Sequence, residues 1–147
     1  MRILKAFNEY LKEGIAKKVT ADYERAKNLQ AESGRKNKSL KERIEKIGVK
    51  NENANDYVEC CYDIIMYLLR AKMYIDGYTT GGKGAHEAEV AYMRMLGFDE
   101  KDVRLMDELR YFRNGIMYYG SAMDKEYAEK VIAFTKRLVP KLDRILK

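Results

Sequence analysis

Residues 57–74 read YVECCYDIIMYLLRAKMY, and this stretch decides the fold. Its apolar side chains fall on nearly every side of a helix instead of forming one stripe, with Asp63 and Arg70 among the polar exceptions. A helix that is apolar on most of its circumference is stable only when other elements surround it. The pattern therefore predicts a central, buried helix.

The rest of the chain has helical spacing as well. Apolar residues recur at steps of three and four, glycines stand where helices should end, and Asp, Asn or Thr stand where N-caps are needed. The expected helices are, in order, about 2–13 ending at Gly14, about 20–34 capped by Thr20, Asn53 or Asn55 to Gly77, about 86–96 ending at Gly97, about 100–119 capped by Asp99, and Asp124 to the C-terminus. No β pattern or repeat is visible. Five or six helices with short loops predict an all-α fold, an antiparallel up-and-down helical bundle.

Three details of these helices stay open at this stage. The second helix either breaks at residues 34–38 and resumes from Ser39 to Ile47, or carries that stretch as a charged face. Pro140 should bend or end the last helix near Val139, because its ring removes a backbone donor and clashes with the preceding turn. The helix at 100–119 should bury a stripe made of Leu105, Leu109, Phe112, Ile116 and Tyr119.

Length and composition indicate one domain, residues 1–147. Hydrophobic residues make up 46% of the chain and charged residues 35%, as in folded proteins that bury their own core. No stretch approaches the ~20 apolar residues that cross a bilayer, and the charged start lacks the apolar segment of a signal peptide. We therefore expect a cytoplasmic protein with no membrane partner.

The cysteines and the single histidine argue against a metal site. Cys60 and Cys61 are adjacent, and neighbouring side chains on a helix diverge by about 100°, so a disulfide between them is awkward. We expect both to be reduced packing residues. With His86 as the only histidine, the usual zinc ligands are missing. The sequence predicts no metal and no cofactor.

The net charge of +6 is unevenly distributed. Residues 1–50 hold 14 Lys and Arg against 7 Asp and Glu, residues 51–100 hold 4 against 9, and residues 101–147 hold 11 against 7. Basic ends around an acidic middle suit a polyanion partner on one face. A solvated surface of mixed charges explains the same numbers, so charge alone leaves both interpretations open.

A glycine-rich stretch, residues 77–84, matches the phosphate-binding pattern G-x-x-x-x-G-K and then lacks its final Ser or Thr. That pattern also requires a preceding strand, whereas a helix precedes this one, so a flexible turn between helices is the better interpretation. Lys83 can still contact a phosphate. His86, directly after the turn, is either a surface or capping residue or a group that titrates near neutral pH.

Residues 107–120, DELRYFRNGIMYYG, carry a family resemblance. In order and position they resemble the late signature of HEPN domains, an Arg followed by a polar residue and, a few positions on, a His. The glycine turn 81–86, the segment 95–98 and the opening of the second helix, 20–26, are similar to the family too. The resemblance implies that Arg113 and Asn114 take the Arg and polar positions and that Tyr118 stands at the His position.

In active HEPN members the resemblance implies metal-independent RNA cleavage by Arg and His at a two-fold dimer interface. Tyrosine has a reference pKa near 10 against about 6.5 for histidine, so Tyr118 is a poor base at neutral pH. Loss of a positioned acid or base costs roughly 10²–10⁴ in rate. This favours a protein that binds RNA without cutting it.

Helix geometry independently favours a homodimer. Arg113 and Tyr118 are five residues apart, which is about 7.5 Å of rise and about 140° of rotation, so they diverge within one chain. A two-fold pair of helices brings both residues of two chains into one cleft. The alternative is that Tyr118 and Tyr119 are packing aromatics and that Arg113 pairs with Asp107, Glu108 or another carboxylate.

Three functions follow for this chain. The favoured one is a non-catalytic HEPN-type module that binds a nucleotide or RNA at the dimer cleft through Arg110, Arg113, Asn114, Lys83 and His86. The second is a metal-independent ribonuclease, for example the toxin of a toxin–antitoxin pair, with Arg113, Asn114 and Tyr118 as catalytic residues. The third is a protein-interaction module whose partner, by the family resemblance, is a small nucleotidyltransferase.

Overall fold

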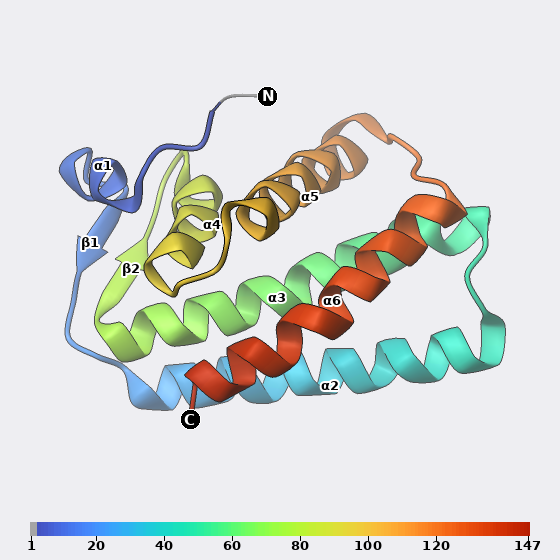
Figure 1. Cartoon of the computed structure of the whole chain (residues 1–147), viewed down its shortest axis with the longest axis horizontal. Coiled ribbons are helices and arrows are strands. Elements are labelled where there is room, and N and C mark those ends of the chain that lie inside the picture. The colour runs from blue at the N-terminus through green and yellow to red at the C-terminus, as the bar shows by residue number, and fades with distance from the viewer. Residues whose placement is uncertain (1–2) are drawn as a thin grey trace.

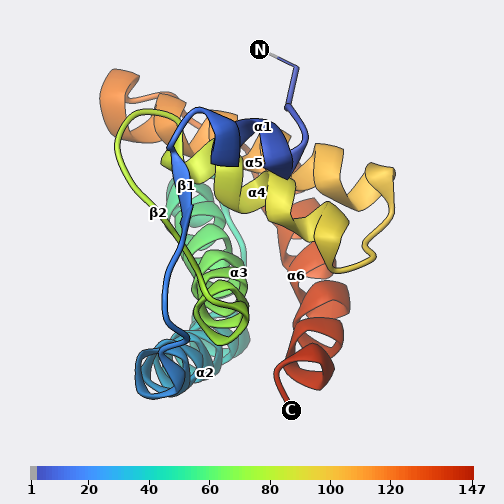
Figure 2. The same ribbon diagram turned by 90° about the vertical axis from the view of Figure 1, so that its left-hand side faces the viewer.

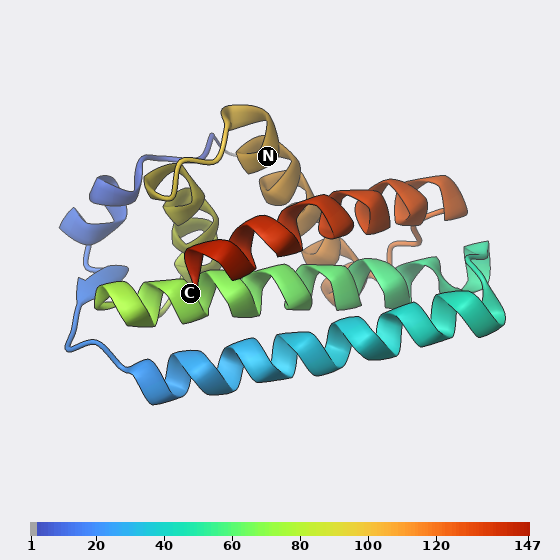
Figure 3. The ribbon, with the colours of Figure 1, turned by 60° about the horizontal axis from the view of Figure 1, so that its bottom comes forward.

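The fold is an all-α helical bundle with one small sheet, as predicted (Figure 1). The computed structural model describes residues 3–147. Within that range the helices and strands are, in order, α1 Phe7–Lys12, β1 Ala16–Lys18, α2 Tyr23–Ile47, the 3₁₀ turn η1 Asn51–Asn53, α3 Ala54–Asp76, β2 Tyr78–Thr80, α4 Ala85–Met95, α5 Glu100–Tyr119 and α6 Lys125–Ile145. The successive long helices α2 and α3 run antiparallel, and α5 crosses α6 at an angle (Figures 1 and 3).

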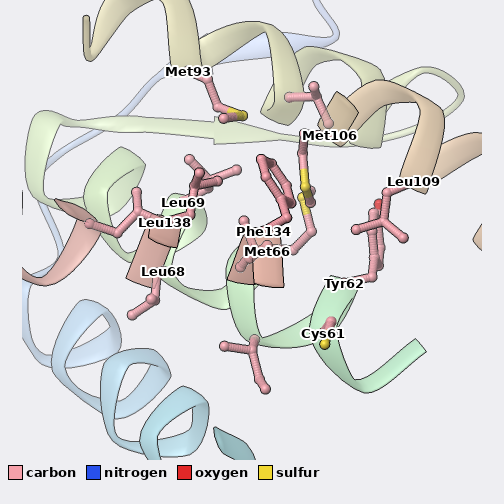
Figure 4. Packing of buried hydrophobic residues seen from close by; sticks show 14 of the residues in the cluster. Cys61, Tyr62, Met66, Leu68, Leu69, Met93, Met106, Leu109, Phe134 and Leu138 are labelled. Carbon is pink, nitrogen blue, oxygen red and sulfur yellow. The ribbon is translucent and has the colours of Figure 1, made fainter. Parts of the chain in front are cut away.

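Helix α3 is the centre of the bundle, which confirms the prediction from residues 57–74. It lies between α2 and α6, and α4 and α5 cover its remaining side (Figures 1 and 3). Its fully enclosed side chains include Val58, Cys61, Ile64, Ile65, Met66, Leu69 and Ala71. Figure 4 shows Met66 and Leu69 among Met93, Met106, Phe134 and Leu138, which come from α4, α5 and α6. Every other long helix thus buries its apolar side against α3.

Helix α2 is continuous, so residues 34–38 are a charged face and not a break. Gly34 lies mid-helix, and the preceding Ser33 is buried, where its hydroxyl donates a hydrogen bond of 2.8 Å to the carbonyl of Ile64. The N-cap is Asp22, whose side chain accepts from the Arg25 amide, so the prediction of Thr20 is wrong by two residues. An aspartate at this position accepts a hydrogen bond from a first-turn amide, and its negative charge also interacts favourably with the positive end of the helix dipole.

The caps predicted at Asp99 and Asp124 are confirmed, because both side chains accept a hydrogen bond from a first-turn amide.

The buried stripe predicted for α5 is only partly right: Leu109 is buried, but Tyr119 is 86% exposed. The buried apolar positions are Val103, Met106 and Leu109, and the last turns of α5 project sideways beyond α3 and α4 (Figure 2). Helix α6 runs on through Pro140 to Ile145, so of the two predicted effects of Pro140, a bend or an end near Val139, the end is wrong.

The sheet β1–β2 was not predicted. Its two antiparallel strands have three residues each, with Ala16 opposite Thr80 and Lys18 opposite Tyr78. Strands this short leave no alternating pattern in the sequence. Residues 3–6 precede α1, which is shorter than the predicted helix 2–13. The start of that prediction, residue 2, lies outside the described residues. The sheet attaches the N-terminal segment to the glycine turn that follows β2.

Among residues 3–147, no helix has the length and apolar character needed to cross a bilayer.

Gly77 and Gly34 provide a matched test of the backbone. Gly77 ends α3 at φ +84°, and a Cβ built there would lie 2.8 Å from the carbonyl oxygen of Val19, whereas a Cβ at Gly34 meets nothing within 4 Å. We expect Gly77→Ala to lower the free energy of unfolding by about 2 kcal/mol or more, and Gly34→Ala to raise it by about 0.5–1 kcal/mol. Urea denaturation followed by circular dichroism measures both. A stabilised Gly77→Ala would contradict the close approach of β1 to α3.

Candidate functional site

A cavity of about 470 Å³ lies between the glycine turn, the start of α4 and the outer half of α5. In Figure 2 the turn after β2 and the end of α5 lie on the same side of the molecule. The cavity is lined by Gly82, Lys83, Gly84, Ala85, His86, Glu87, Arg110, Asn114 and Tyr118. The structure therefore brings together five of the six residues predicted for the site, from two segments distant in sequence.

The α5 side of the cavity follows from helix periodicity. Arg110, Asn114 and Tyr118 are spaced by four residues, so they form one row along the helix. This spacing was visible in the sequence, although the family resemblance placed the emphasis on Arg113. Opposite them, Gly84 in the left-handed conformation (φ 90°) begins α4 without a side-chain cap. First-turn amides of a helix have no intrahelical partner, so this helix start is favourable for an anion.

Arg113 is the predicted site residue that lies outside the cavity. Its guanidinium turns toward α3, where it lies 5.3 Å from the centre of the Tyr62 ring and 3.7 Å from the Asp63 carboxylate. Its Nε is buried and has no hydrogen-bond partner among the described residues. Arg113 therefore pairs with a carboxylate of α3 and not with its helix neighbours Asp107 and Glu108.

The two cations of the cavity have different surroundings. Arg110 is buried; its Nε donates to Asp107 at 2.8 Å, and its Nη1 lies 3.9 Å from Glu87. These carboxylates hold the guanidinium in place and compensate its charge. Lys83 is exposed, and within residues 3–147 it forms no ion pair. The positive charge available to a ligand is therefore that of Lys83.

His86 is held by a buried carboxylate. Its Nδ1 lies 2.9 Å from Glu89, whose side chain is only 6% exposed and which also accepts a 2.7 Å hydrogen bond from Nε of Arg70. A carboxylate can only accept, so Nδ1 of His86 is the donor in this bond, and Nη2 of Arg70 lies 3.3 Å from the same Nδ1. The sequence analysis missed Glu89 and Arg70. Two features of the sequence could have identified them. Glu89 stands three residues after His86, on the same face of the helix, and Arg70 is a charged residue on a helix predicted to be buried, which needs a partner.

Glu89 stays ionised in this environment. Burial by itself raises the pKa of a carboxyl group, but the hydrogen bond from His86 and the charge and hydrogen bond of Arg70 outweigh it, so the pKa of Glu89 is lowered. Because Glu89 is enclosed, its ion pair with Arg70 is stronger than a surface pair, and removal of one partner is correspondingly costly.

The outer end of α5 carries exposed apolar side chains. Tyr118 is 72% exposed, and Tyr111, Met117 and Tyr119 are also open to solvent, so Tyr118 and Tyr119 are not core aromatics of one chain, and of the two alternatives only a position at its rim agrees with this exposure. A groove of about 520 Å³ runs beside them, between Phe112 and Met123. Tyr118 lines both this groove and the cavity. Its ring therefore stands at the mouth of the cavity with one side free.

In the described part of the chain, no group of three or more His, Cys, Asp and Glu side chains could hold a metal ion. Cys60 and Cys61 are unpaired and buried, as expected. Burial raises the pKa of both thiols, that of Cys61 to about 12, so neither is a ready nucleophile.

Comparison of the chain with protein-family models, with curated proteins and with solved structures gives no match. The class of protein is thus defined by the bundle and its cavity, and the HEPN resemblance stays a hypothesis based on residues 107–120.

The buried pair of Glu89 gives a pH-dependent prediction. A lowered carboxyl pKa adds stability above the ordinary value near 4.3, and this stability is lost as the pH falls through the folded-state pKa. We expect Glu89→Gln to lose about 3 kcal/mol of unfolding free energy at neutral pH, and the difference from wild type to shrink toward about pH 3. Urea denaturation across this range measures it. The exposed Glu45→Gln is the control, and a Glu89→Gln deficit that does not vary with pH would contradict the ion pair.

Proposed function

We propose that the protein is a non-catalytic, HEPN-type module that binds a nucleotide or RNA in the cavity between the glycine turn and α5. The observation that carries this proposal is the meeting of Lys83, His86, Asn114 and Tyr118 around one cavity. Its volume of about 470 Å³ is within the range of ligand-binding pockets, about 300–1,000 Å³.

The chemistry of the lining fits a phosphorylated base. Lys83 provides a cation for a phosphate, and the start of α4, the positive end of its helix dipole, has no side-chain cap. The exposed ring of Tyr118 provides a surface on which a base can stack, as in proteins that bind single strands. Asn114, one turn earlier on α5, has a donor and an acceptor for the edge of that base. Two buried cysteines without a disulfide suit the reducing cytoplasm expected above.

We infer that the apolar end of α5 is covered by a second copy of the chain. Tyr111, Met117, Tyr118 and Tyr119 expose large apolar surfaces on one segment, which is costly in an isolated molecule. A two-fold contact along α5 would cover the part of this patch outside the cavity with the same surface of the partner, and the side of the Tyr118 ring that faces the cavity would stay open to a base. Since Tyr118 belongs to both the patch and the cavity, such a homodimer would place two cavities beside its interface.

The binding function is tested with a fluorescently labelled RNA octamer in the presence of a chelator, followed by anisotropy. We expect Lys83→Ala to weaken binding about tenfold. The slope of log K against log salt concentration should become less steep by about 0.7, because one contact with a phosphate is lost. Tyr118→Ala should weaken binding by about 1–3 kcal/mol through the loss of stacking.

The controls differ from these variants by a single feature. Tyr118→Phe keeps the ring and should bind like wild type. Arg113→Ala removes an arginine of the same helix that lies outside the cavity and should leave affinity unchanged, provided that circular dichroism shows a native fold. An octamer that does not bind, or binding that depends on Arg113 and not on Lys83, would refute the proposed site.

A second candidate function, metal-independent ribonuclease activity, is favoured by one observation. His86, oriented by Glu89, lines the same cavity as Tyr118. In such a reaction Nε2 of His86 takes the proton of a ribose 2′-hydroxyl, the 2′ oxygen bonds to phosphorus, and the bond from phosphorus to the 5′ oxygen breaks. The leaving 5′ oxygen takes a proton from the Tyr118 hydroxyl, which is restored from His86. His86 would thus replace the histidine missing from the HEPN signature.

This activity predicts that the octamer is cut in the presence of chelator to fragments with 2′,3′-cyclic phosphate and 5′-hydroxyl ends. His86→Gln should then lower the rate by roughly 10²-fold or more because the proton acceptor is lost, with anisotropy showing that RNA still binds. Gel electrophoresis with end-group analysis measures it. Intact RNA after long incubation, or equal cleavage by His86→Gln, would exclude this mechanism and leave the binding module.

A further inference from the structure

A second, smaller hollow of about 260 Å³ adjoins the cavity. It lies between α3, β2 and the starts of α2 and α4, and its lining includes Arg25, Tyr74, Thr79 and Thr80. Ala85 and His86 line both the hollow and the cavity. The two depressions are therefore neighbours on either side of the first turn of α4, and His86 stands between them.

The hollow has a flat cationic wall. The guanidinium of Arg25 lies 4.6 Å from the centre of the Tyr74 ring and covers it. Arg25 is exposed, so its other face is open to solvent. Guanidinium planes stacked in this way accept a nucleobase on the free face, and they retain their charge for a phosphate. The threonine hydroxyls of β2 add short polar groups beside this wall.

Further positive charge lies on the elements next to the hollow. Lys17 and Lys18 are exposed on β1, and Lys17 lies opposite Thr79 in the sheet (Figure 2). With Arg25 and Lys83 they make four cations that form no ion pair within residues 3–147.

The acidic groups of this region are mostly engaged. Glu89 is paired with Arg70. Asp22 caps α2, and Glu24 in the same first turn is exposed. The surface from β1 to the cavity is thus net basic, which suits a chain of phosphates.

We propose that this hollow is a second subsite, and that the ligand is a single-stranded polynucleotide which spans both depressions. The inference rests on the proposed function. The hollow is smaller than the pockets that enclose a whole small ligand, about 300 Å³ upward, so it fits one part of a longer molecule. One base stacks on Tyr118, the backbone passes His86 at the start of α4, and the next base stacks on Arg25. A mononucleotide fills the cavity alone.

The experiment is competition against the labelled octamer by unlabelled adenosine 5′-monophosphate, an RNA octamer and a DNA octamer, in chelator. We expect the unlabelled RNA octamer to bind at least about tenfold tighter than the mononucleotide. Arg25→Ala should weaken the RNA octamer about 5- to 10-fold and leave the mononucleotide unchanged. Lys46→Ala is the matched control, because it removes one charge from the same helix about 30 Å away and should leave both affinities unchanged.

The outcomes separate this inference from the proposed function. If the mononucleotide binds and depends on Lys83, but the octamer binds no tighter or Arg25→Ala acts like Lys46→Ala, the cavity stands and the second subsite is refuted. If no probe binds, both are refuted. Octamer binding that depends on Arg25 supports the subsite whether the sugar is ribose or deoxyribose, and the ratio of the two affinities identifies the natural strand.

Discussion

The burial of α3 is the constraint on which the rest of the structure depends. A helix of 23 residues with apolar side chains on most of its circumference can be removed from water only when several elements surround it. Helices α2 and α6 cover two sides, and α4 and α5 cover the third (Figures 1 and 3). The positions of α4 and α5, and hence of the cavity between their ends, follow from this requirement.

Two charged residues of α3, Arg70 and Asp63, form ion pairs with the helices around it. Arg70 is compensated by Glu89 of α4, and Asp63 lies beside both Lys36 of α2 and Arg113 of α5. These two charges of the central helix are thus matched by opposite charges on helices that cover it. The pair of Arg70 and Glu89 also fixes the orientation of His86, so a requirement of the core determines the geometry of the surface site.

Sequence reasoning was most reliable where one local rule sufficed. The apolar run predicts α3, and Asp99 and Asp124 predict helix starts, because these signals lie within a few residues. It failed where distant segments decide. Strand β1 exists only because β2 pairs with it, and Tyr119 is exposed because none of residues 3–147 covers it. Arg110 and Arg113 are equivalent by composition, and only the packing against α3 shows which one lines the cavity.

The glycine turn depends on the first part of the chain. The Gly81 amide donates to the carbonyl of Ile15, and the Ile15 side chain packs where a Cβ of Gly84 would point. Arg94 in turn donates to the carbonyl of Lys5, a partner 89 residues away. During synthesis this N-terminal segment emerges before any of its partners exist, so it can dock only after β2 and α4 have been made. The turn that presents Lys83 acquires its final shape only then, and the affinity of the cavity therefore reports that the two ends of this half of the chain have met.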